Sequence, residues 1–140
     1  MDGKHITSLQ LVYDNWGLIS EDTTSQSRLS IYRSGRVRTD FFTHASVHPA
    51  RSQVYAVKIS DMEVFFLNLQ SKLGVLQWVG DYTEPLCDGF HWKLTIRFSD
   101  RSRRTVKGTV GYPLGSEKLG TGVRKLVKFE EQPWVFGWGD

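Results

Sequence analysis

The chain has 140 residues, which is the usual size of one globular domain with one hydrophobic core. Hydrophobic residues make up 39% of it and charged residues 24%, a balance that excludes a disordered chain. The apolar runs are too short for a membrane helix, and the single cysteine, Cys87, excludes an internal disulfide. We therefore expect one domain over 1–140 that acts in the cytoplasm, without a cofactor.

Alternating apolar and polar residues predict strands in the first part of the chain. One strand is expected over 6–13, followed by a polar loop over 20–27. Residues 29–42 then alternate on both sides of Ser34 and Gly35, a pattern typical of a β-hairpin. The strand over 6–13 is expected to extend this hairpin.

The clearest period of two lies at 90–98 and predicts a second hairpin. Large apolar residues hold one parity and polar residues the other, which places the two sets on opposite faces of a sheet. Residues 99–102 form a polar turn that leads to a partner strand over 103–110.

A helix is predicted after each hairpin. Ser60 and Glu63 fit a capping box at the start of an amphipathic segment that ends at Gly74. A weaker helical stripe begins near Ser116, although Gly120 and Gly122 disfavour a helix there. The expected fold is α+β, an antiparallel sheet from two related hairpins, each followed by a helix (ββα-ββα).

The two hairpins also match in sequence. An alignment without gaps gives identical residues at five of ten positions. The matched pairs are Leu29 with Leu94, Ile31 with Ile96, Ser34 with Ser99, Arg36 with Arg101 and Arg38 with Arg103. This match predicts an internal repeat over about 6–74 and 88–130, with hairpin chemistry alone as the alternative.

The last third of the chain resembles small bacterial and phage domains. The likeness rests on Asp88-Gly89, the W-x-L-x-I-x-F strand from Trp92 to Phe98, and the G-x-x-x-Y-P segment that ends at Pro113. The pattern has glycine where this chain has Arg101. The resemblance implies a hairpin followed by a helix and a bacterial or phage origin, and it implies no activity.

Basic residues cluster on the two hairpins. Those expected to contact a partner are Arg33, Arg36, Arg38, Lys93, Arg97, Arg101, Arg103 and Arg104, with Arg28 and Lys107 beside them. If both hairpins join one sheet, the residues of outward parity and those at the turns form a cationic surface. Tyr32 and His91 lie near these basic residues in the sequence, and each has a ring on which a base could stack. The alternative is a solvated face whose charges discourage aggregation.

The sequence evidence for a metal site or a catalytic nucleophile is weaker than that for a cationic surface. His44, His48, Cys87 and His91 offer ligands of the types zinc prefers, but Pro49 disfavours a helix through His48 and no CxxC pair is present. No nucleophile elbow, phosphate loop or paired-carboxylate motif occurs either. We expect no metal site and no catalytic residue.

The tail over 133–140 is rich in aromatic residues. Trp134 and Trp138 alternate with Phe136, so the tail is expected to pack as a strand or to contact a partner.

These patterns predict a non-enzymatic binding protein whose cationic hairpin face meets nucleic acid, or the acidic surface of a complex that handles nucleic acid. One alternative is a small phage-encoded inhibitor of a bacterial defence protein, similar to an anti-CRISPR. A second alternative is a small hydrolase or metal protein that uses Cys87 and the histidines. A homodimer formed by pairing of sheet edges is also open.

Overall fold

A computed structural model of the protein describes residues 5–15, 24–43, 48–73, 81–82, 90–109 and 116–136. Its strands are β1 (Ile6–Asn15), β2 (Thr24–Tyr32), β3 (Arg36–Thr43), β4 (Arg51–Ala56), β5 (Asp81–Tyr82), β6 (Phe90–Phe98) and β7 (Arg103–Gly108). Its helices are α1 (Ile59–Asn68), which continues into a π-helical segment, η1 (Leu69–Leu73), and α2 (Ser116–Leu126). No helix in these ranges is long and apolar enough to cross a bilayer.

The strands form one sheet in the order β4-β3-β2-β1-β6-β7-β5. All neighbours are antiparallel except the two-residue strand β5, which pairs parallel to β7. The predicted α+β class with an antiparallel sheet and two helices is confirmed. The order ββα-ββα is not, because four strands precede α1 and β1 inserts between the two hairpins.

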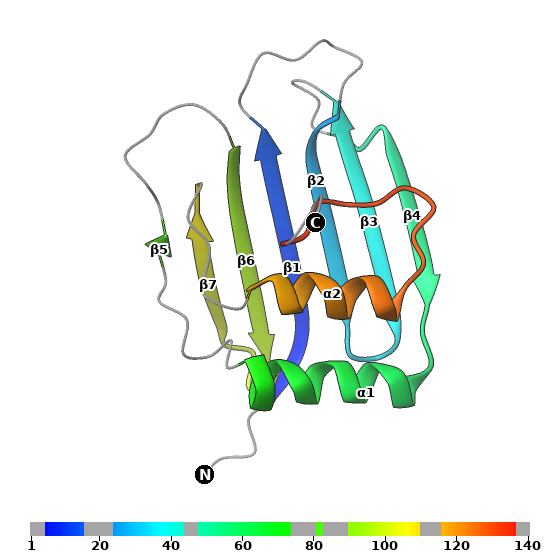
Figure 1. Ribbon diagram of the computed structural model, residues 1–140, viewed down its shortest axis with the longest axis vertical. Coiled ribbons are helices and arrows are strands. Elements are labelled where there is room, and N and C mark those ends of the chain that lie inside the picture. The colour runs from blue at the N-terminus through cyan, green and yellow to red at the C-terminus, as the bar shows by residue number, and fades with distance from the viewer. Residues whose placement is uncertain are drawn as a thin grey trace.

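The core lies between one face of the sheet and the two helices. Leu11 of β1 sits between Leu29 of β2 and Leu94 of β6, and the neighbouring rung is built in the same way. All three leucines are buried, as is Val123 of α2. Both helices run across the strands on this face (Figure 1). Within the described part of the chain, no helix or strand covers the opposite face, which we call the open face.

Two segments differ from their predicted secondary structure because of contacts that are distant in sequence. The expected polar loop over 20–27 is partly a strand, since β2 begins at Thr24 and pairs with both β1 and β3. The strand β4 was not expected at all. In a half-buried strand the apolar residues face the core, but in β4 the apolar residue Val54 is exposed. The alternation of β4 is therefore the reverse of the usual pattern.

The predicted capping box is wrong. The N-cap of helix α1 is Lys58, two residues before Ser60, so the helix starts at Ile59, and no side chain caps it. The carboxylate of Glu63 instead accepts hydrogen bonds from Arg33, at 2.6 Å from Nε and 2.8 Å from Nη2. Arg33 also donates to the carbonyl of Ile6 at 2.8 Å. One guanidinium therefore joins β1, the β2–β3 turn and α1.

The segment that follows α2 returns over the helix-covered face of the sheet (Figure 1). Val135 and Phe136 are fully buried, and the Phe136 ring meets Trp92 edge to face at a centroid distance of 5.0 Å. A side chain at Gly120 would put its Cβ atom 1.8 Å from the Phe136 carbonyl oxygen. Gly120 is thus what allows the segment to approach α2 so closely. The described residues of the predicted tail strand, 133–136, form no strand.

The two hairpins extend from β1 in opposite directions. Leu29 and Leu94, which the alignment matches, lie on either side of Leu11 and face the same core. The second strand of each hairpin lies on the side away from β1. To overlay β2 on β6 and β3 on β7, one hairpin must be turned by half a turn about its strand direction. This rotation would place the core side of one hairpin on the open face of the other. The internal repeat stays a prediction.

Candidate functional site

Seven basic residues face the same way on the open face of the sheet. In the strand registers these residues alternate with those that are in line with the buried leucines, so they belong to the opposite face of the sheet. We call this set the cationic face, and its members are Arg28, Arg36, Arg38, Lys93, Arg97, Arg103 and Lys107. All are exposed except Arg28, which is half-buried. Among the described residues, three acidic residues belong to the same face: Asp14, Asp40, and Asp81 of β5, which the strand register places next to Lys107.

The hairpin β6–β7 carries like charges directly opposite one another. Lys93 pairs with Lys107, and four residues further along β6 Arg97 pairs with Arg103. Directly opposed side chains on antiparallel strands have Cβ atoms about 4.5–5.5 Å apart, so like charges there repel. The two pairs lie about 14 Å apart along the strand, at about 3.4 Å per residue. This edge of the sheet therefore concentrates positive charge at two places.

On the hairpin β2–β3, local contacts orient the cations. The Arg36 guanidinium lies over the Tyr32 ring at 4.9 Å from its centroid, and the Arg28 guanidinium lies over Phe42 at 5.0 Å. Arg38 Nε lies 3.0 Å from Asp40 Oδ1, which also accepts a hydrogen bond from Ser52 at 2.6 Å. Asp40 is buried and Arg38 stays exposed beside it. Arg36 and Arg38 of β3 therefore add positive charge on the side of β1 that is opposite to the hairpin β6–β7.

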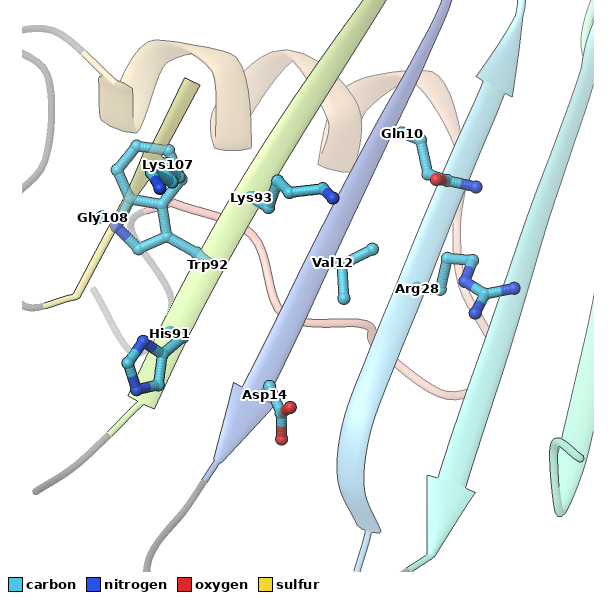
Figure 2. A pocket seen from close by; sticks show the side chains of 9 residues that line it. All are labelled: Gln10, Val12, Asp14, Arg28, His91, Trp92, Lys93, Lys107 and Gly108. Atoms are coloured by element: carbon cyan, nitrogen blue, oxygen red, sulfur yellow. The ribbon is translucent and has the colours of Figure 1, made fainter. Parts of the chain in front are cut away.

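A hollow of about 780 Å³ lies on this face over β1, β2, β6 and β7 (Figure 2). Its lining includes three members of the cationic face, Arg28, Lys93 and Lys107. Strand β1 contributes Val12, with Gln10 and Asp14 on either side of it. These β1 residues were not predicted from the sequence. The available signal was the alternation of Leu9, Leu11 and Tyr13 with Ser8, Gln10 and Asp14, and only the sheet order shows which face the second set occupies.

Three residues that were expected to contact a partner lie elsewhere. Arg104 pairs with Ile96, so it lies on the helix-covered side and is not part of the cationic face, and its contact with a partner stays a prediction. Arg33 lies in the β2–β3 turn and its guanidinium is held by Glu63. These hydrogen bonds lower the pKa of the Glu63 carboxyl and raise that of Arg33. Arg101 lies in the β6–β7 turn, exposed, with a left-handed φ of 73°.

Trp134 packs within the fold. Its ring stacks on Tyr13 with centroids 4.8 Å apart and planes at 14°, and its backbone N–H donates to Ser27 Oγ at 3.3 Å. Burial, with a smaller effect from Asp14, raises the pKa of the Tyr13 phenol. This side of the sheet is the helix-covered one, so Trp134 is not part of the cationic face. Trp138 lies outside the described residues.

His91 and His48 are exposed, whereas His44 and Cys87 lie outside the described ranges. In the part of the chain that the structure describes, no three side chains of His, Cys, Asp or Glu form a group able to hold a metal ion. The alternative chemistry based on Cys87 stays a prediction.

The cationic face and its hollow are the site that this fold offers. No protein-family model, curated protein or solved structure matches the chain.

Proposed function

We propose that this protein acts by binding, without catalysis, and that its cationic face binds nucleic acid. The observation that carries the proposal is the collection of seven cations on the open face, which no helix or strand of the described ranges covers. Phosphate backbones supply regularly spaced negative charge, and neutralising them with Lys and Arg releases counterions, which drives association.

The opposed pairs on β6–β7 strengthen the proposal. A sheet built for stability alone would place opposite charges, or small polar residues, at directly facing positions. Here Lys faces Lys and Arg faces Arg. Departures from local rules without a structural gain are typical of functional sites. An anionic ligand relieves this repulsion when it binds, so the free protein carries a cost that the complex does not.

Ring systems on the same face favour nucleic acid over an acidic protein surface. Tyr32 and the guanidinium of Arg36 already form a stacked pair at 4.9 Å. Unpaired bases stack on aromatic rings and on guanidinium planes, whereas the carboxylates of an acidic protein surface have no ring that could stack there. His91 adds an exposed ring at the other end of the face. We therefore place nucleic acid ahead of an acidic protein partner or a defence protein that a phage inhibitor would target.

A salt series tests the proposal. In fluorescence anisotropy of a labelled single strand and of its duplex, the logarithm of the association constant should fall linearly with the logarithm of the salt concentration. The slope should be about −0.7 per phosphate contacted in the single strand. Removing Arg97 and Arg103 together (R97A/R103A) should weaken binding and reduce this slope. The control is K125A/K128A, which removes the same charge from exposed positions on or after α2.

Polyglutamate is the comparison ligand for an acidic protein. Competition by polyglutamate as strong as that by nucleic acid would contradict the choice of nucleic acid. A flat salt response, or equal effects of the two double variants, would contradict the assignment of the face.

A further inference from the structure

The hollow on the cationic face has the size of a small-ligand site. Its volume of about 780 Å³ falls within the range of roughly 300–1,000 Å³ that is usual for pockets that hold small molecules and cofactors. It lies on the regular part of the sheet, where four strands fix the positions of its lining. The hollow is therefore a candidate for one defined chemical group, beyond general attraction between the face and a polymer.

The lining combines an apolar centre with charged surroundings. Val12 of β1 lies directly opposite Lys93 of β6 on one side and Arg28 of β2 on the other. Figure 2 shows the Lys93 side chain reaching across β1 on the same side as Val12. A ligand that fits this arrangement has a flat, weakly polar part for Val12 and an anionic part for the ammonium groups.

The opposed pair defines where the anion lies. Lys107 faces Lys93 across β6–β7. The Lys93 side chain lies over β1 in Figure 2, and a rotation of this exposed side chain toward β7 brings both ammonium groups to one ligand group. A phosphodiester of a strand has two terminal oxygens that share one negative charge, and a phosphate monoester has three that share up to two, so either group can accept hydrogen bonds from both lysines. Asp14, on the far side of Val12 from Gln10, repels a phosphate from its own end of the hollow.

We propose that this hollow binds a nucleoside phosphate, with the phosphate between Lys93 and Lys107 and the ring system against Val12. The inference rests on the proposed function, because the nucleoside phosphate is taken to be one unit of the bound strand. A free nucleotide has the same chemistry and is the other source of this ligand.

The test compares AMP, adenosine and a short single-stranded oligonucleotide, titrated into ¹⁵N-labelled protein and followed by NMR. AMP should shift amide signals of β1, β6 and β7 around the hollow, and adenosine should bind roughly tenfold or more weakly, since charge-assisted hydrogen bonds to phosphate are lost. The variant K93A/K107A should weaken AMP binding by a similar factor. The matched control R97A/R103A removes the neighbouring opposed pair and should change AMP affinity by about twofold or less.

Both double variants relieve repulsion, so both should fold, and thermal unfolding verifies this. If both variants weaken the oligonucleotide equally and AMP does not bind, the hollow is not a nucleotide site and the proposed function stands. If AMP binds through the lysine pair and no oligonucleotide binds, the proposed function fails and the ligand is a free nucleotide. If neither ligand binds, both proposals are overturned.

Discussion

Lys93 and Lys107 face each other across β6 and β7, and the strand register places Asp81 of β5 on the other side of Lys107. This relationship makes function and stability compete at one position. Replacing Lys93 by Glu turns the repulsion from Lys107 into attraction and should stabilise the fold by about 0.2–1 kcal/mol. The same change should weaken oligonucleotide binding. Thermal unfolding and anisotropy measure the two effects.

The control for this substitution is Lys128→Glu, which changes the net charge equally at an exposed position after α2. It should leave binding nearly unchanged. Loss of stability in Lys93→Glu would mean that the lysines do not repel each other in the folded protein.

Gly120 and Gly122 lie in the same helix and should respond in opposite ways to alanine. Gly120→Ala drives a methyl group against the Phe136 carbonyl, so it should cost about 1–3 kcal/mol through overpacking. In Gly122→Ala the new Cβ atom meets the Phe65 ring at an ordinary 3.5 Å, and the helix should gain up to about 1 kcal/mol. Urea unfolding measures both. Equal effects would show that the segment after α2 does not depend on Gly120.

Arg101 should tolerate glycine and benefit from it. Its φ of 73° is costly for a residue with a Cβ atom and free for glycine. We expect Arg101→Gly to raise the free energy of unfolding by about 1 kcal/mol. Arg101→Ala removes the same charge and keeps the backbone cost, so it should give no such gain. A gain in both variants would point to charge as the cause.

Two ion pairs between distant segments should make stability depend on acid pH. Hydrogen bonds from Arg33 lower the pKa of Glu63, and those from Arg51 lower the pKa of Glu131. A lowered carboxyl pKa contributes stability that is complete above the ordinary pKa of the group and is lost as the pH falls through the lowered value.

The variant E63Q/E131Q should therefore be less stable than the parent at neutral pH. The two proteins should converge as the pH falls through the lowered pKa values of Glu63 and Glu131. Urea unfolding across this range gives the comparison. A constant difference at every pH would mean that the glutamates act through packing.

Local patterns predicted the parts of the fold that depend on neighbouring residues. The period of two at 90–98 and the stripe around Leu119 and Val123 matched β6 and α2, because each buries one face. Glu63 was misassigned because its partner, Arg33, is distant in sequence. Strand β4 was missed because its alternation follows contacts with β3 and the segment after α2, such as the ion pair between Arg51 and Glu131 at 2.7 Å.

The candidate site was predicted in composition and only partly in geometry. The parity of Lys93 and Arg97 followed from a strand with clear alternation. Arg103 and Arg104 are adjacent, so only one of them can share that face, and the register with β6 decides which. Val12 and Asp14 joined the site because β1 lies between the hairpins, an arrangement that no local pattern contains.

The central position of β1 also sets the order in which the sheet can be completed. During synthesis β2 emerges soon after β1 and pairs with one of its edges, but the other edge waits for β6. Roughly 80 further residues must be made first, which takes on the order of ten seconds at typical rates of translation. Over that time the nascent chain exposes a bare strand edge, the usual starting point for aggregation. A late strand thus fills the middle of this sheet, and closing β1 against β6 is the step at which a chaperone would matter most.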